Sequence, residues 1–322
     1  MPTFSRIFAI CTSYSYVGGP PNFVNGVSDH EFNGPFNDWL NVLDYGADPT
    51  GTIDSTAAFQ NCINDLWNSA VQFGSDADPN TWYLPSCGYV PSGTYLISNT
   101  LYWPSPIATP SGGTLINLYG QDPSTTVLKW VGPENTAMFW FDSANQTTIG
   151  RLTFDGQGIT GTIGARLERN VAMGTAQSYN TVTDCIFKDL AYGFYNTHGD
   201  NFGTDSEQTI IRCKFYRCSN YGVLVQGPQA FDYWVRQCYF EHCYIGVGLP
   251  LDPMCENFNL HEEPDGYDSS SGYVSVYDCV FNSSKYFDIS AIRGSNIGIR
   301  RNISFNSSRF LKVYPSTVIN VV

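Results

Sequence analysis

A short apolar motif that recurs along the chain is the feature that most limits its possible folds. From about residue 115 onward, two apolar residues separated by one residue recur as Ile116/Leu118, Leu152/Phe154, Cys185/Phe187, Cys213/Phe215, Cys238/Phe240, Cys279/Phe281 and Ile303/Phe305. From the second motif on, the second apolar residue is always Phe. Motifs without an insertion between them lie roughly 24 to 28 residues apart. A repeat of this length predicts a solenoid in which each repeat forms one coil.

Alternation of apolar and other residues within each motif indicates a β-strand, and the fixed position of Phe indicates stacking from coil to coil. Parallel coils about 4.8 Å apart would place the phenylalanines in one column inside the core. Four cysteines at the first motif position would form a second column, the cysteine ladder: Cys185, Cys213, Cys238 and Cys279. Buried thiols pack as small hydrophobic groups, which is the favoured interpretation. Disulfides between coils stay an open alternative.

The segment from Asn41 to Asp65 predicts an amphipathic helix in a chain otherwise poor in helix. Asp54 and Ser55 are typical capping residues, and apolar residues recur at helical spacing after them. The end of a coil stack exposes its core and unpaired backbone groups, which a helix can cover. We therefore divide the chain into an extension (1–40) and a β-helix domain (41–322). Its cap motif and helix occupy 41–73 and its coils about 80–322, with truncation at the C-terminus as an open alternative.

The N-terminal motif resembles that of one subgroup of the pectate-lyase-like superfamily. It reads DYGADPTGTIDSTAAFQ (residues 44–60) and is followed by the turn and strand VPSGTYLISNTLYW (residues 90–103). The resemblance implies an all-β fold, a single-stranded right-handed parallel β-helix (solenoid) capped by an N-terminal amphipathic α-helix. The subgroup includes exo-β-1,3-glucanase-like, rhamnogalacturonase-like and phage tailspike-like proteins, so a polysaccharide is the implied partner. The paired aspartates and GHG turn of polygalacturonase-like members are absent here.

Charge and hydropathy exclude two classes of partner. The formal net charge of -13 would repel nucleic acid and anionic membranes. No run approaches the ~18 apolar residues that a membrane-spanning helix needs. The N-terminus carries no clear signal peptide, and the tailspike-like resemblance implies an extracellular or virion-surface location. A homotrimer is a further alternative that this resemblance implies.

The residues that follow each Phe are the candidate catalytic residues, because a polymer would lie along an exposed face of the coils. Asp189 and Glu241 would lie two coils apart, roughly 10 Å, near the separation at which inverting glycosidases admit a water molecule. We predict Asp189, Glu241, Arg217 and His242 as the catalytic set. A carboxylate beside Arg217 would stay ionised as the base, and one against an aromatic ring would hold a proton as the acid. The alternative is a set of solvated ion pairs between coils, including Lys188.

Two loop insertions, residues 195–209 and 249–272, supply further candidates. The first carries His198 as a substrate-binding residue and three alternative catalytic carboxylates, Asp200, Asp205 and Glu207. The second carries weak metal-ligand candidates, Glu262, Glu263 and Asp265. Their spacing does not match an EF-hand loop, and a solvated acidic loop is the favoured alternative to a Ca²⁺ site.

Aromatic side chains are the remaining candidates for contacts with sugar rings. Tyr216, Tyr239 and Trp234 are predicted to bind substrate through their flat faces. Together with these residues, the resemblance implies a polysaccharide-binding and polysaccharide-cleaving protein of the glycoside hydrolase class, which requires no cofactor. Two alternatives stay open: a polysaccharide lyase that uses a cation such as Ca²⁺, with Arg217 or Lys188 as its base, and a non-catalytic receptor-binding spike or adhesin.

Overall fold

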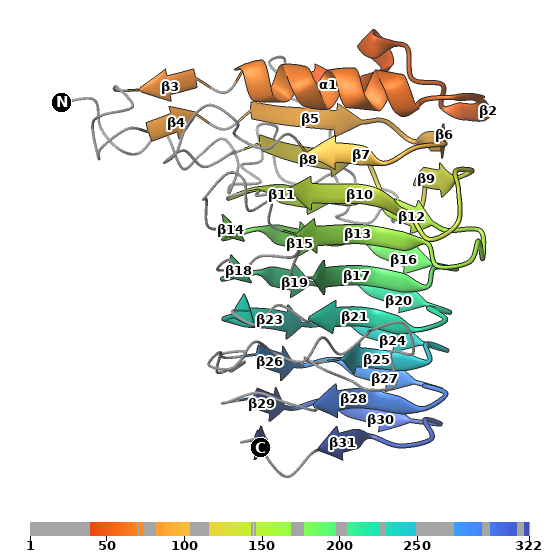
Figure 1. The fold of residues 1–322 in the computed structure, drawn as a ribbon, viewed down its shortest axis with the longest axis vertical. Coiled ribbons are helices and arrows are strands. Elements are labelled where there is room, and N and C mark those ends of the chain that lie inside the picture. Colours follow the sequence, from red (N-terminus) through yellow and green to blue (C-terminus); the bar gives the residue numbers. More distant parts are fainter. Residues whose placement is uncertain are drawn as a thin grey trace, which may run out of the picture.

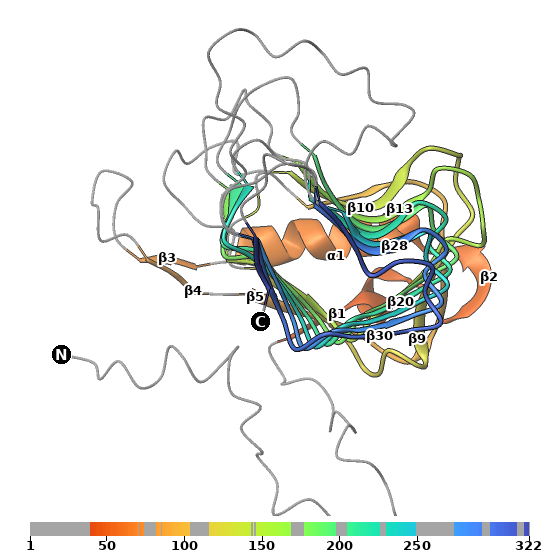
Figure 2. The ribbon, with the colours of Figure 1, turned by 90° about the horizontal axis from the view of Figure 1, so that it is seen from below.

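A stack of parallel coils makes up the molecule, and each coil passes in turn through three sheets (Figure 1). The computed structural model describes residues 39–69, 71–73, 82–84, 86–103, 116–142, 144, 146–168, 177–197, 205–225, 230–248, 274–291, 297–313 and 319–321. The predicted right-handed parallel β-helix is confirmed, with the hand that parallel crossovers almost always take. Seen along the stack, the coils superpose on one cross-section (Figure 2).

The strands of each sheet follow one another in chain order. The first sheet contains β1 (Leu40–Asn41), β5 (Ser86–Val90), β8 (Ile116–Gly120), β11 (Thr148–Gly150), β15 (Thr181–Thr183), β19 (Thr209–Ile211), β23 (Tyr233–Arg236), β26 (Val274–Tyr277), β29 (Ile297–Arg300) and β32 (Ile319–Val321). The second contains β2 (Thr50–Asp54), β6 (Gly93–Ile97), β9 (Thr126–Trp130), β12 (Thr153–Asp155), β16 (Ile186–Lys188), β20 (Lys214–Tyr216), β24 (Tyr239–Glu241), β27 (Val280–Asn282) and β30 (Ile303–Phe305). The third contains β7 (Leu101–Trp103), β10 (Ala137–Asp142), β13 (Ile163–Glu168), β17 (Tyr192–Thr197), β21 (Tyr221–Val225), β25 (Ile245–Gly248), β28 (Phe287–Ala291) and β31 (Leu311–Val313). Two small sheets add β14 (Gln177–Ser178), β18 (Asp205–Ser206) and β22 (Ala230–Phe231), and the antiparallel pair β3 (Val71–Phe73) and β4 (Trp82–Leu84).

The N-terminal motif folds into a turn and a helix that close one end of the stack. A 3-10 helix, Val42–Tyr45, ends at Gly46, whose φ is 89°. The Asp48 carboxylate then accepts hydrogen bonds from the backbone N–H groups of Thr50, Thr52 and Ile53 and so fixes the turn. The helix α1 (Thr56–Ser69) follows, with the Asp54 carboxylate accepting from the Thr56 N–H at 3.0 Å.

The apolar face of α1 covers the N-terminal end of the core, as predicted. Its buried residues are Ala58, Phe59, Cys62, Ile63 and Leu66. The helix lies across the end of the stack beside β5 (Figures 1 and 2). In the described part of the chain, no helix has the length and hydrophobicity needed to cross a membrane.

A column of stacked phenylalanines runs through the core along the second sheet. Its members are Phe154, Phe187, Phe215, Phe240 and Phe281, all fully buried and paired strand to strand. Neighbouring ring centroids lie 4.8 to 5.0 Å apart, and the ring planes differ by 5 to 9°. The predicted column is therefore confirmed for five coils.

At both ends of the column, the predicted register is wrong. Ile116 and Leu118 belong to the first sheet, and the residue that pairs with Phe154 is Leu128. At the other end, Ser304 pairs with Phe281, while Phe305 points outward and is 42% exposed. A shift of one residue moves every side chain of a strand to the opposite face, and all three residues of β30 are exposed, so burial does not hold Ile303 and Phe305 inward in this coil.

Glycines in the third sheet give the phenylalanine rings their space. Gly193 is an example: a Cβ there would lie 2.5 Å from Cδ1 of Phe215 and 2.6 Å from the carbonyl oxygen of Gly222. Equivalent contacts occur at three other positions of the same column: Gly164, Gly222 and Gly246. The glycine that follows Phe154, Phe187, Phe215 and Phe240 in the sequence is therefore a packing requirement of the Phe column, whereas Asp288 takes this position after Phe281.

The cysteine ladder lies at the corner between the first and second sheets. All four thiols are buried and free. Each sulfur contacts a carbonyl oxygen of the preceding coil, for example Cys213 Sγ with Val182 O at 3.5 Å and Cys238 Sγ with Ile210 O at 3.6 Å. These contacts support the interpretation of the cysteines as packed thiols.

Candidate functional site

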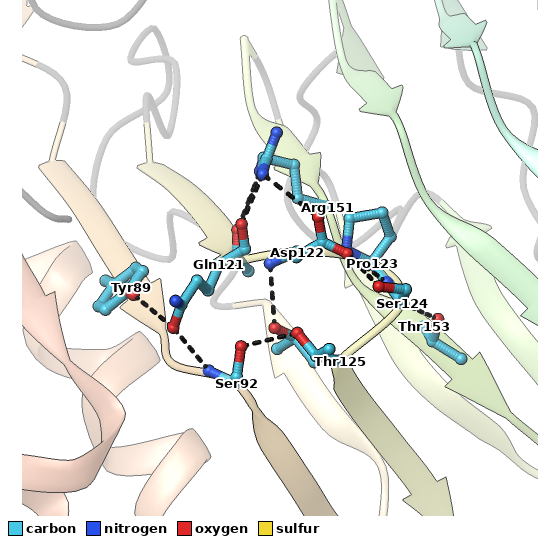
Figure 3. Close-up of polar contacts among 11 residues, drawn as sticks. Tyr89, Ser92, Gln121, Asp122, Pro123, Ser124, Thr125, Arg151 and Thr153 are labelled. Atoms are coloured by element: carbon cyan, nitrogen blue, oxygen red, sulfur yellow. Dashed lines mark hydrogen bonds and ion pairs between the residues drawn. The ribbon is translucent and has the colours of Figure 1, made fainter. Parts of the chain in front are cut away.

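The loop between β8 and β9 is raised above the outer face of the second sheet. It comprises Gln121, Asp122, Pro123, Ser124 and Thr125, whereas later coils turn this corner with two residues between the strands. The longer connection forms a wall near the N-terminal end of the sheet face (Figure 3). We call residues 121–125 the wall loop.

Side chains on three sides hold the wall loop in place (Figure 3). The buried Arg151 guanidinium donates to Gln121 O at 2.5 and 3.1 Å. On the N-terminal side, Gln121 Oε1 accepts from Tyr89 Oη and Ser92 N, each at 3.0 Å. On the side of the sheet, the Thr153 hydroxyl donates to Pro123 O. These hydrogen bonds therefore fix the position of the wall loop on the surface.

A column of polar side chains crosses the outer face of the second sheet beside the wall. Strand pairing places Asp155, Lys188, Tyr216, Glu241 and Asn282 in successive coils of one column. These are the residues that directly follow each Phe of the core column, so the inward Phe fixes their outward direction.

A hollow of about 350 Å³ lies between the wall loop and this column. Its lining residues are Pro123, Ser124, Val127, Thr153, Ile186, Lys188, Tyr216, Arg217 and Glu241. Such a volume falls at the small end of ligand sites in proteins. Across the hollow, the wall loop therefore faces the carboxylate of Glu241, the cations of Lys188 and Arg217, and the phenol of Tyr216.

Both cations in the hollow are already paired with carboxylates. Lys188 Nζ lies 2.8 Å from Oδ2 of Asp155, a nearly buried side chain. The Arg217 guanidinium binds Asp189 through two hydrogen bonds, of 2.6 and 2.7 Å. These bonds from Arg217 hold the pKa of the Asp189 carboxyl below its usual range.

Among the described residues that line the hollow, Glu241 is the one carboxylate. Its Oε1 accepts a hydrogen bond of 3.2 Å from Asn282 Nδ2, which also reaches the Tyr239 hydroxyl at 3.2 Å. Among the described side chains, no cation forms an ion pair with Glu241. The neighbouring Tyr216 is half-buried, and burial together with the Glu241 charge raises the pKa of its phenol. Tyr216 therefore stays a neutral hydrogen-bond donor at physiological pH.

The structure brings most of the predicted site residues to this region of the surface. Asp189, Arg217 and His242 occupy one corner column, each with φ between 52 and 54°. Glu241 and Tyr216 lie in the adjacent column, and the Tyr216 and Tyr239 rings are 6.0 Å apart. Asp189 and Glu241 are two coils apart as expected, but Asp189 does not line the hollow. Their catalytic roles stay predictions.

Trp234 lies apart from the predicted tyrosines. It is on β23 of the first sheet, and its neighbour in that strand, Val235, points into the core. Trp234 therefore faces outward from a different sheet than Tyr216 and Tyr239, and the three do not form one binding surface.

The loop candidates are described only in part. His198, Asp200, Glu262, Glu263 and Asp265 lie outside the described residues, and so does the side chain of Asp205. Glu207 is described: it adopts φ 57° and accepts from Ser206 Oγ at 3.1 Å. Within the described ranges, no group of three or more His, Cys, Asp or Glu side chains is placed to hold a metal ion.

Two features around the hollow were missed by reasoning from sequence: the partners of its charged residues and the wall loop. Asp155 and Asn282 carry the same signal as Glu241, since each directly follows a core Phe, and extending that rule along all coils would have found them. The wall loop carries no comparable signal. Its position depends on how far a five-residue connection projects from the coil, which the repeat does not encode.

Comparison with known proteins agrees with this architecture. A sequence model of the rhamnogalacturonase A/epimerase, pectate lyase-like family matches residues 39–129. The chain has the fold of the pectate-lyase-like β-helix proteins. The match covers the cap motif and the first coils, so the resemblance of the N-terminal motif is confirmed. No curated protein matches the chain significantly in sequence.

Solved structures share the fold over most of this chain. Bacteriophage phi29 gene product 12 has a TM-score of 0.58 at 16% identity, covering 87% of this chain and 36% of that one. Geobacillus virus E2 ORF18 has a TM-score of 0.51 at 16% identity, covering 88% and 62%. A 1,3-α-1,4-β-D-galactose-4-sulfate-3,6-anhydro-D-galactose-2-sulfate 4 galactohydrolase has a TM-score of 0.50 at 12% identity, covering 86% and 60%. The chain spans less than two thirds of the length of each. At these identities, the likeness is one of fold alone.

Proposed function

We propose that this protein binds a polysaccharide along the outer face of the second sheet and cleaves it by hydrolysis at the hollow. The observation that carries the proposal is Glu241, a carboxylate without a cation partner among the described residues, facing a hollow of about 350 Å³. The carboxyl that acts as general acid needs access to the sugar, and the absence of a cation beside it lets it hold a proton. The galactohydrolase of similar fold is consistent with this proposal.

Roles follow from the surroundings of each group. Glu241 acts as the general acid on the glycosidic oxygen, and Tyr216 donates a hydrogen bond to a sugar hydroxyl. Asp189, which Arg217 keeps ionised, acts as the base two coils away. A separation of about 10 Å leaves room for a water molecule, so inversion of the anomeric carbon is expected.

Hydrolysis is favoured over lyase chemistry by the state of the two cations. A lyase needs a free base to remove a proton next to the uronate carboxyl. Lys188 and Arg217 are the basic residues of the hollow, and each is engaged by an aspartate. Neither is therefore available as that base in this arrangement.

A second candidate function, glycan binding without cleavage, is favoured by one observation. Both carboxylate oxygens of Asp189 accept from Arg217, so activation of water would require this ion pair to rearrange. A receptor-binding protein of a virion surface, extracellular and trimeric, fits this alternative. The two viral proteins of similar fold are consistent with it.

Product analysis distinguishes these functions. The protein is incubated with a panel of neutral and acidic polysaccharides, and we expect new reducing ends without unsaturated products. Glu241→Gln should lower turnover at least about 100-fold while glycan binding persists. Glu134→Gln, the same change at an exposed turn carboxylate away from the hollow, should leave turnover unchanged.

Two results would contradict the proposed hydrolase function. Undiminished turnover in Glu241→Gln would remove Glu241 from the chemistry. Binding that Tyr216→Ala weakens, without any product from the panel, would establish the non-catalytic alternative instead.

A further inference from the structure

A second surface rich in arginine lies on the outer face of the first sheet. Strand pairing places Arg236 of β23, Tyr277 of β26 and Arg300 of β29 in one column. Figure 1 shows these strands in successive coils of the C-terminal half. Parallel strands are about 4.8 Å apart, so the two arginines lie about 10 Å apart on either side of the tyrosine. We call Trp234, Arg236, Tyr277 and Arg300 the arginine platform.

Glycine and serine side by side let the Tyr277 ring lie across the sheet. A Cβ on Gly298 would lie 2.6 Å from the Tyr277 hydroxyl, so glycine at this position lets the phenol lie where it does without shifting. Ser275 Oγ donates to the same hydroxyl at 3.1 Å and fixes the ring orientation. The ring therefore extends over its neighbours and presents a flat apolar surface.

Guanidinium groups lie beside both aromatic rings of the platform. The Arg300 Cζ atom is 5.5 Å from the Tyr277 ring centroid, and the Arg236 Cζ atom is 5.9 Å from the Trp234 centroid. Both arginines are exposed. A guanidinium beside an aromatic face is held loosely in place by the ring quadrupole while its N–H groups remain available to a ligand.

The two platform arginines differ from their neighbours in their pairing. At the adjoining corner, Arg212 binds Asp184 and Arg301 binds Asp278, each through two hydrogen bonds of 2.6 to 2.8 Å. In the described part of the molecule, Arg236 and Arg300 have no such carboxylate partner. In a chain of net charge -13, this strip carries two arginines outside any ion pair among the described residues, next to the Arg301–Asp278 pair.

We propose that the arginine platform binds an acidic polysaccharide through the carboxylates of its uronic acid residues. The flat rings of Tyr277 and Trp234 take the apolar faces of the sugars, and the guanidiniums take the carboxylates in the two-bond geometry that three Arg–Asp pairs of this molecule already adopt. The platform is on a different sheet from the hollow. It does not depend on the proposed hydrolase.

Titration calorimetry with three soluble probes tests the platform. The probes are a galacturonic acid oligosaccharide, a neutral galactose oligosaccharide of equal length, and dextran sulfate. We expect the uronic acid probe to bind most tightly and its affinity to fall as salt rises. Arg236→Gln with Arg300→Gln should weaken that binding at least about tenfold.

Three controls separate the platform from other effects. Arg309→Gln removes an exposed arginine that lies 5.9 Å from the Tyr286 ring outside the platform, and it should leave affinity unchanged. Glu134→Gln, at an exposed turn carboxylate between β9 and β10 and outside both the platform and the hollow, should also leave affinity unchanged. An unchanged thermal midpoint of the double variant would show that its fold is intact.

Several outcomes would overturn the proposal. Binding of the uronic acid probe that survives in the double variant would place the site elsewhere. Equal affinity for dextran sulfate would show a general response to polyanions, and equal affinity for the neutral probe would show that charge has no part. Arg300→Lys keeps the charge but loses the planar fork, so full affinity in that variant would contradict recognition by two hydrogen bonds.

Discussion

Single residues turn the chain at the corners between sheets, and most of them are not glycine. Arg212 and Arg217 flank the strand β20 of the second sheet. Gln237 and His242 flank the next strand of that sheet, β24, and all four residues have φ of 52 to 54°. Asp184 and Asp189 do the same one coil earlier, again five residues apart. In this region of φ, an L residue is strained, and β-branched residues are strained most. Each corner N–H also bonds to the next coil, as Gln237 N does to Tyr277 O at 3.0 Å.

Gln237 is the corner at which this strain is easiest to measure, because its side chain is exposed. Replacing it by Gly removes the strain at the cost of a more flexible unfolded chain, so we expect no loss of stability and up to about 1 kcal/mol of gain. Replacing it by Val should cost about 2 kcal/mol. Urea unfolding measures both.

The matched control for Gln237 is Lys214, an exposed residue in the extended strand β20. There, Val suits the strand and Gly weakens it by about 0.5 to 1 kcal/mol, so the order of the two substitutions should reverse. The same order at both positions would contradict the role of the left-handed backbone.

Packing between the phenylalanine and glycine columns ties the second sheet to the third. A Cβ on Gly222 would lie 2.6 Å from Phe240 Cδ1 and 2.7 Å from the Gly246 carbonyl oxygen. We expect Gly222→Ala to destabilise the fold by about 1 to 3 kcal/mol through overpacking. Thermal or urea unfolding measures the change.

A second substitution tests whether the ring is the cause. Phe240→Leu removes the ring edge, so Gly222→Ala should cost at least about 0.5 kcal/mol less in that background. Phe154→Leu is the control, since it lies three coils away in the same column and should be additive with Gly222→Ala. Equal coupling for both pairs would contradict direct contact.

The cysteine ladder should behave as a row of inert thiols. Burial raises the pKa of the Cys185 and Cys238 thiols, and each sulfur contacts a backbone carbonyl of the preceding coil as well as its neighbours in the ladder. We expect no labelling of Cys185, Cys213, Cys238 and Cys279 by iodoacetamide in the native protein and full labelling after unfolding in urea. A thermal midpoint that falls on addition of reductant, with a peptide linking two ladder cysteines, would contradict this prediction.

At the scale of the whole molecule, the repeat in the sequence predicted the coils because the core repeats. Phe187, Phe215 and Phe240 stack as expected, since each must fill the same cross-section. The surface was harder to predict. Glu241 and Tyr216 came together through the repeat, but the wall loop and the separation of Trp234 depend on corner geometry. A pattern of buried positions does not encode that geometry.

The pH range of stability is also a property of the whole molecule, set by carboxyls and phenols in several coils. Hydrogen bonds from Thr50 and its neighbours lower the pKa of Asp48, and those from Arg217 and Arg301 lower the pKa of Asp189 and Asp278. A lowered folded-state pKa contributes stability that is complete above the unfolded value of about 4 and is lost as pH falls through the folded value. On the alkaline side, burial and the bond to Asp65 raise the pKa of Tyr45 to about 12. The contribution of Tyr45 to the stability of the fold is complete below about pH 10, and it is lost as the pH rises through 12.

We therefore expect the urea midpoint to be flat between about pH 5 and 9 and to fall on both sides. Asp48→Asn tests the acidic side, because an amide cannot accept the full set of bonds that closes the N-terminal turn. The variant should be less stable than the parent at pH 7, and the difference should shrink below pH 4 as the parent carboxyl is protonated. Glu134→Gln should have the same stability as the parent protein at every pH. A difference that stays constant down to pH 2 would show that the Asp48 charge contributes nothing and that only the shape of its side chain holds the turn.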